Sequence, residues 1–82
     1  MSIKLVPGKL YRIKRQLRIV GGHPSKAPWE DTLFEKDSIY LCTSFKTYKK
    51  YRHASIQFLV GLVEVGLSVN SESLGTWFEV VK

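Results

Sequence analysis

The feature that most constrains this fold is a two-residue alternation of apolar and polar side chains in short segments separated by turn-forming residues. It is clearest in residues 55–69, where two apolar rows flank Gly61: Ile56, Phe58 and Val60, then Val63, Val65, Leu67 and Val69. Successive side chains of a strand point to opposite faces, so each row predicts a strand with one buried face and Gly61 predicts a hairpin turn. No segment shows a convincing 3.6-residue period, and glycines interrupt the longest apolar region, so no long helix is expected.

The remaining segments extend this pattern. Residues 10–20 alternate, but Arg15 breaks the apolar row, which predicts a bend or bulge near Arg15 and Gln16. A strand is expected from residue 38 to about 47, with Ile39, Leu41, Thr43 and Phe45 on one face and Tyr40, Cys42, Ser44 and Lys46 on the other. Residues 70–75 predict a turn, with one helical turn capped by Ser71, and residues 77–81 predict a last short strand.

One long loop is expected at about residues 16–36. Its middle, residues 21–32, holds two glycines and two prolines and should be irregular. A loop this long in a small domain is more often functional than neutral. Trp29 is the one large apolar side chain of residues 21–32. It either folds back as a lid on the core, which is favoured because an exposed indole is costly, or contacts a partner.

Together these segments predict an all-β fold: a small, partly open barrel of five or six antiparallel strands, formed by residues 1–82 as a single domain. The order of the parts resembles a Src-homology-3-like barrel. Residues 35–39, Glu-Lys-Asp-Ser-Ile, look like the diverging turn of that fold, and residues 75–81, Gly-Thr-Trp-Phe-Glu-Val-Val, look like its closing strand. Short basic barrels of this kind are also frequent among accessory proteins of bacteriophages.

The resemblance does not extend to proline-rich peptide binding. No Ala-Leu-Tyr-type run follows the first strand, and no Pro-x-x-Tyr precedes the last one. What the resemblance implies is a spatial relation, because in such barrels the long loop and the loop after the second strand lie on one side. That relation would bring His23 and Trp29 near residues 48–52.

Charge is distributed unevenly along the chain. The formal net charge is +6, with seven cations and no acid in residues 1–26 and four more cations in residues 45–53, again without an acid. A field of one sign favours polyanionic partners, although the cations of a small basic domain are also commonly only solvated. Residues 45–53 add tyrosines that can stack on unpaired bases.

The preferred function is therefore non-enzymatic binding of nucleic acid, either of a single strand or along a phosphate backbone. The alternative is a protein-binding module, such as an adaptor or an inhibitor of a larger protein, because aromatic and arginine side chains also dominate protein interfaces. The candidate contact residues are Arg12, Lys14, Arg18, Trp29, Tyr48, Lys49, Lys50, Tyr51 and Arg52.

Other chemistry finds little support. Cys42 is the single cysteine, so no internal disulfide forms and a reducing cytoplasm is expected. Its mid-strand position favours a small buried hydrophobe over a nucleophile paired with His23 or His53. The sequence shows no metal ligands at close spacing and no phosphate-binding glycine loop, so no metal or cofactor is expected. It shows neither an apolar leader nor an apolar segment long enough to span a membrane, so no membrane is expected as a partner.

Overall fold

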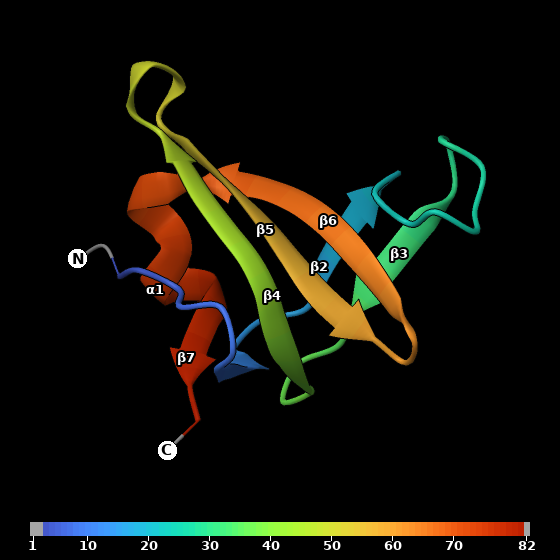
Figure 1. Cartoon of the computed structure of the whole chain (residues 1–82), viewed down its shortest axis with the longest axis horizontal. Coiled ribbons are helices and arrows are strands. Elements are labelled where there is room, and N and C mark those ends of the chain that lie inside the picture. Colours follow the sequence, from blue (N-terminus) through green and yellow to red (C-terminus); the bar gives the residue numbers. More distant parts are fainter. Residues whose placement is uncertain (1–2, 82) are drawn as a thin grey trace.

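The computed structural model describes residues 3–81. Two antiparallel sheets hold the strands of this part of the chain, and the connections include short 3₁₀ turns at Lys49–Tyr51 (η1) and Ser71–Ser73 (η2) and one helical turn, α1 (Leu74–Trp77) (Figure 1). The strands are β1 (Leu10–Ile13), β2 (Leu17–Val20), β3 (Asp31–Phe34), β4 (Ile39–Tyr48), β5 (His53–Val60), β6 (Val63–Asn70) and β7 (Phe78–Val80).

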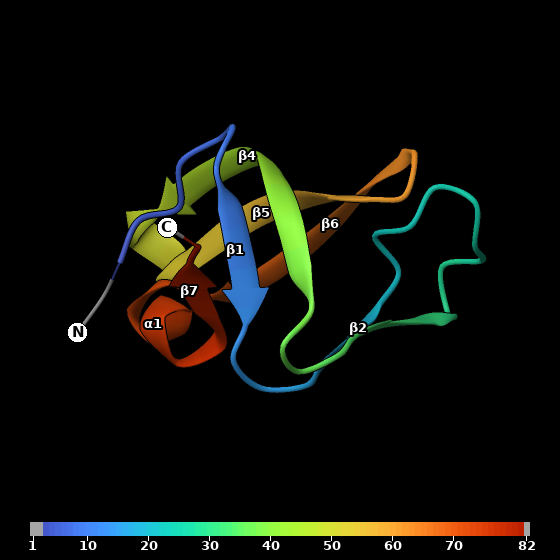
Figure 2. The same cartoon turned by 90° about the horizontal axis from the view of Figure 1, so that it is seen from below.

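The larger sheet has the strand order β6-β5-β4-β1-β7, and β2 and β3 form a separate two-stranded ribbon. All neighbours are antiparallel, as expected from short connections between successive strands. The all-β prediction is confirmed. The sheet curls strongly but is not closed into a barrel, because β6 and β7 remain its two edges (Figures 1 and 2).

The core lies on the inner face of this curled sheet. Alternation in β5 and β6 is confirmed, since Ile56, Phe58 and Val65 are fully buried and lie on the same side as Leu67. The predicted turn at Gly61 is also present, with a φ of +65° that favours glycine. Rings of Phe34, Phe58 and Phe78 fill the interior, with the last two 5.4 Å apart between centroids.

The prediction for the faces of β4 is wrong for its first half. Cys42 is fully buried, opposite the buried Phe58, whereas Ile39 is exposed. The register with β5 shifts between Cys42 and Ser44, so Thr43 is an extra residue in a β-bulge. A bulge moves the following side chains to the other face, and Phe45 therefore lies opposite the buried Ile56 on the core side.

The predicted loop at residues 16–36 is in fact a ribbon with an irregular tip. A bend at Lys14 and Arg15, as predicted, ends β1, after which β2 and β3 pair from Leu17↔Phe34 to Val20↔Asp31. The ribbon forms because its inward positions, including Phe34, pack on the core while its other face meets solvent. Residues 21–30 connect its strands without regular structure.

The tip of this ribbon docks on the free edge of β6. Gly66 N donates a hydrogen bond to Gly22 O at 2.9 Å. The approach is so close that a Cβ on Gly22 would lie 2.0 Å from Gly66 O. Glycine is therefore required at position 22 both for space and for its φ of +76°.

The segment after β6 contains the predicted helical turn, but a different residue caps it. Asn70 Oδ1 accepts a hydrogen bond from Glu72 N at 2.8 Å, so the cap is Asn70 and not Ser71. Leu74, the first residue of α1, is buried and fixes this turn against the core. Within residues 3–81, none of the helices has the length and apolar character needed to cross a membrane.

Candidate nucleic-acid interface

Residues 45–53, called here the basic hairpin, form the far end of β4, the turn η1 and the start of β5. Tyr48 pairs with His53 across the strand ends, and Lys49–Tyr51 make a 3₁₀ turn between them. Arg52 closes the turn in the left-handed conformation (φ +52°), with its N–H donating to Lys49 O at 3.3 Å. Ser71 N donates to Arg52 O at 3.1 Å, which ties the hairpin to η2.

Three rings of the basic hairpin form one exposed aromatic row. Tyr48 stacks on His53 with centroids 4.8 Å apart and an interplanar angle of 27°, and Tyr51 lies 6.0 Å from the same imidazole. Tyr48 is 37% exposed and Tyr51 66% exposed, so neither tyrosine is tucked into the core. Phe45, by contrast, is half-buried and packs on the core. The row therefore lies at the surface, with both tyrosine rings reached by solvent.

Cations surround these rings. Lys46 Nζ lies 5.7 Å from the Tyr48 ring centroid and Lys50 Nζ 5.6 Å from that of Tyr51, within the range of cation–π attraction. Lys49 and Arg52 are exposed on the same turn. Among residues 3–81 the ion pairs lie elsewhere, between Arg12 and Glu79 and between Arg18 and Asp31. The hairpin thus presents positive charge that local carboxylates do not neutralise.

The other predicted cations are not part of this cluster. Arg12 forms a 3.6 Å ion pair with Glu79, and Lys14 Nζ donates to Gly75 O at 2.8 Å. Arg12 lies opposite Ile39, at the end of β4 that is roughly 30 Å from Tyr48 at about 3.3 Å per residue. Arg18, on β2, forms a 3.6 Å pair with Asp31. These three cations therefore make their contacts on β7, on α1 and on the β2–β3 ribbon, outside the basic hairpin.

Trp29 is not a lid on the core. Its side chain is 77% exposed at the tip of the β2–β3 ribbon. The irregular tip explains this. Gly22 is held at Gly66 of β6, and residues of the segment 21–28 line a hollow of about 930 Å³ together with Leu59 and Leu62, whereas Trp29 does not line it. The predicted closeness of His23 and Trp29 to residues 48–52 is also wrong, since the two loops lie at opposite ends of the molecule (Figures 1 and 2).

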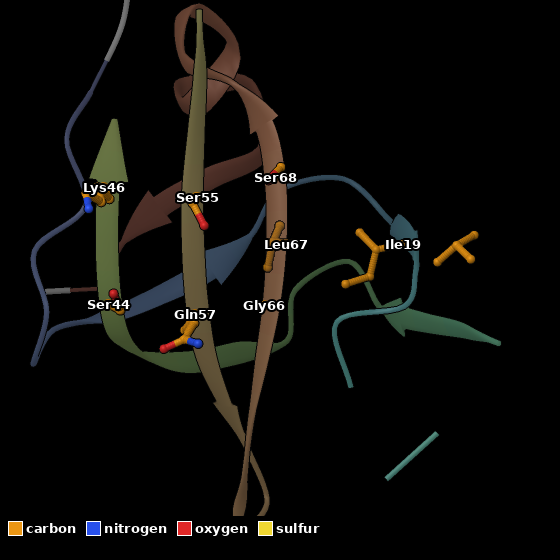
Figure 3. Close-up of a pocket in the computed structure, with 9 residues that line it drawn as sticks. Ile19, Ser44, Lys46, Ser55, Gln57, Gly66, Leu67 and Ser68 are labelled. Carbon is orange, nitrogen blue, oxygen red and sulfur yellow. The ribbon is translucent and has the colours of Figure 1, made fainter. Parts of the chain in front are cut away.

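The sequence interpretation missed a set of polar residues beside the basic hairpin. The outer face of β4, β5 and β6 carries a shallow groove whose floor bears hydroxyl groups, one amide and one ammonium group: Ser44, Lys46, Ser55, Gln57 and Ser68 (Figure 3). The signal was present as small polar residues at the outward positions of three consecutive strands. Recognising that these residues lie side by side requires the register of the three strands, and the bulge at Thr43 shifts that register between β4 and β5.

Neither catalytic nor metal chemistry gains support from the arrangement. Cys42 is buried, and that burial raises the pKa of its thiol, so the reactive thiolate is disfavoured. In the part of the chain covered by residues 3–81, no three His, Cys, Asp or Glu side chains come together as a set that could hold a metal ion.

Comparison with known proteins does not assign this chain to a family. No family model, no curated protein and no solved structure matches it. The site must therefore be interpreted from its own chemistry.

Proposed function

We propose that this protein is a non-enzymatic module that binds single-stranded nucleic acid through the basic hairpin. The observation that carries the proposal is the exposed row of Tyr48, His53 and Tyr51 surrounded by four cations without an ion-pair partner in residues 3–81. Proteins that bind single strands combine these two elements, stacking platforms and positive charge along the backbone.

The aromatic row supplies the first element. Tyr48 and His53 already lie nearly parallel, so a base added to the exposed face of either tyrosine extends an existing stack. Stacking of one base on an aromatic side chain contributes about 1–3 kcal/mol in proteins of this type. A duplex keeps its bases stacked on each other, so this contribution favours unpaired strands.

The cations supply the second element and predict its salt dependence. Each neutralised phosphate of a single strand contributes about −0.7 to the slope of log K against log salt. Lys46, Lys49, Lys50 and Arg52, if all contact phosphates, give a slope of about −2.8. This value is small compared with large DNA-binding proteins, so binding is moderate and readily reversed by salt.

The testing experiment replaces Lys49, Lys50 and Arg52 together by Ala and measures oligonucleotide binding by fluorescence anisotropy over a salt series. The slope should fall in magnitude by about 2, and binding at moderate salt should be lost. Thermal stability should change little because exposed charges contribute little to folding.

A matched control replaces three exposed cations outside the basic hairpin, namely Lys9, Arg15 and Lys36. It removes the same net charge and should retain most of the affinity. Equal losses in the two triple variants would show that only the net charge matters, and the basic hairpin would not be a site.

A second candidate function is protein binding at the other end of the molecule. Trp29 is 77% exposed and Leu62 is 100% exposed, and such side chains commonly anchor protein interfaces. Trp29→Ser should abolish salt-insensitive capture of a protein partner while leaving oligonucleotide binding intact. Capture that survives Trp29→Ser but is lost in the hairpin triple variant would instead place the protein contact at the hairpin.

The Src-homology-3-like class remains our proposal for the fold family. It is supported by the order of the parts: a strand, a ribbon-like long loop, three consecutive antiparallel strands, a 3₁₀ turn and a last strand beside the first. Asp37, with a φ of +71°, occupies the turn that resembles the diverging turn. We also propose a cytoplasmic location and an accessory role in a bacteriophage.

A further inference from the structure

The groove on the outer face of β4, β5 and β6 is built from registered rows of side chains. Lys46, Ser55 and Ser68 make one row, and Ser44, Gln57 and Gly66 make the next. Figure 3 shows these residues on the three adjacent strands, with Ile19 beyond β6. Three of these residues are serines and one is a glycine, so much of the floor is low, and the space above it measures about 420 Å³.

The groove is continuous with the basic hairpin. The row beyond Lys46, Ser55 and Ser68 consists of Tyr48, His53 and Asn70, so the aromatic stack and the groove lie on one face. Lys46 belongs to both, since it lines the groove and its Nζ lies 5.7 Å from the Tyr48 ring. Tyr48 lies four positions from Ser44, about 13 Å along β4. A strand stacked on Tyr48 therefore reaches the groove within a few nucleotides.

The chemistry of the groove suits a base more than a phosphate. Lys46 is its single cation, at the end nearest the hairpin, and the rest of the floor offers hydroxyls and the exposed amide of Gln57. Glu64 lies farther along the same face, opposite Leu59 on β5. The carboxylate of Glu64 repels phosphates. Ile19 and Val20 form an apolar wall, and Val20 is 66% exposed, so it can pack against the face of a base.

Gln57 favours one base in particular. A glutamine amide carries a donor and an acceptor on one plane, which match the N6 amino group and N7 of adenine in a bidentate pair. A serine hydroxyl can donate or accept a hydrogen bond, so serines alone do not discriminate between bases. Ser55 and Ser68, in the next row, can therefore hydrogen-bond to the remaining donors or acceptors of the base, and they do not counter the preference of Gln57 for adenine.

We infer that this groove is an adenine-recognition subsite, in which Gln57 reads the base that follows those stacked on the basic hairpin. The inference rests on the proposed function, because the hairpin delivers the strand to the groove. It adds sequence preference to a contact that stacking and charge alone leave tolerant of any base.

The experiment measures the affinity of two fluorescent octanucleotides, oligo(dA) and oligo(dT), for three proteins: the parent, Gln57→Ala and the control Gln16→Ala. Gln16 is an exposed glutamine that follows the bend after β1. The parent should bind oligo(dA) more tightly. Gln57→Ala should weaken oligo(dA) binding by about fivefold or more, as for the loss of a bidentate base contact, and change oligo(dT) binding by less than twofold. Gln16→Ala should alter neither.

Two results would overturn the inference and are distinguishable. If Gln57→Ala affects both oligonucleotides equally, or neither, while the Lys49, Lys50 and Arg52 triple variant loses both, the groove does not read adenine although the hairpin binds nucleic acid. If the triple variant binds both oligonucleotides like the parent, the proposed function fails and the groove inference fails with it. Circular dichroism of each variant verifies that the exposed substitutions leave the fold intact.

Discussion

Gly22→Ala is the substitution that tests most sharply how the ribbon docks on the sheet. Gly22 has a φ of +76°, and an added Cβ would lie 2.0 Å from Gly66 O and 3.1 Å from Gly66 C. Backbone atoms cannot move aside as a flexible side chain does, so the ribbon tip must withdraw from β6. The hydrogen bond from Gly66 N to Gly22 O is then lost.

The expected loss of stability follows from two contributions. Holding alanine in the left-handed region costs about 1–2 kcal/mol, and losing the hydrogen bond costs about 1 kcal/mol. The free energy of unfolding should therefore fall by about 2–3 kcal/mol, and the melting temperature by about 10–20 °C for a domain of this size. Urea unfolding followed by tryptophan fluorescence measures the first quantity, because Trp29 and Trp77 report on the ribbon and the core side.

Gly61→Ala is the matched control. Gly61 also has a positive φ, +65°, but no atom lies within 4 Å of its added Cβ. It should therefore cost only the conformational contribution, about 1–2 kcal/mol. If Gly22→Ala destabilises the protein no more than Gly61→Ala, the ribbon does not contact β6 as closely as the structure has it.

Three smaller predictions concern the core and one cap. Thr32→Val should raise the free energy of unfolding by about 1 kcal/mol, measured in urea, because the buried Thr32 Oγ1 has no hydrogen-bond partner in residues 3–81; a loss would reveal a partner. Burial raises the pKa of the Cys42 thiol above its ordinary value of 9.0. The buried neutral thiol therefore contributes its full stability below pH 9, and this contribution is lost as the pH rises further. The melting temperature of the parent should fall more steeply above pH 9 than that of Cys42→Ala. Parallel slopes would contradict this. Asn70→Ala should cost about 1 kcal/mol in urea unfolding through loss of the cap on η2, whereas Ser71→Ala should cost less.

The strands that alternate without interruption were predictable from the sequence. β5 and β6 have their buried faces and their turn at Gly61 where the pattern places them, because local alternation and turn chemistry agree there. β4 was predicted as a strand but with the wrong face inward over its first half. A bulge adds one residue without changing composition, so the alternation alone does not reveal it.

Placement of the loops was less predictable than the strands themselves. The exposure of Tyr48 and Tyr51 agrees with the sequence interpretation, since a basic segment between two core strands meets solvent. Trp29 was expected to cover the core, but its position depends on Gly22 docking at Gly66, a contact between residues 44 positions apart that leaves no local signal. Likewise, Arg12 and Arg18 share a sequence pattern but lie on different sheets.

The central claim is that unpaired nucleic acid binds the outer face from the basic hairpin to the groove. Backbone amide chemical-shift mapping by NMR, during titration with an unstructured octanucleotide, measures this directly. The account predicts the largest shifts at residues 46–53, followed by Ser55, Gln57 and Ser68, with little change at residues 21–30. Shifts concentrated around Trp29, or none at saturating oligonucleotide, would contradict it.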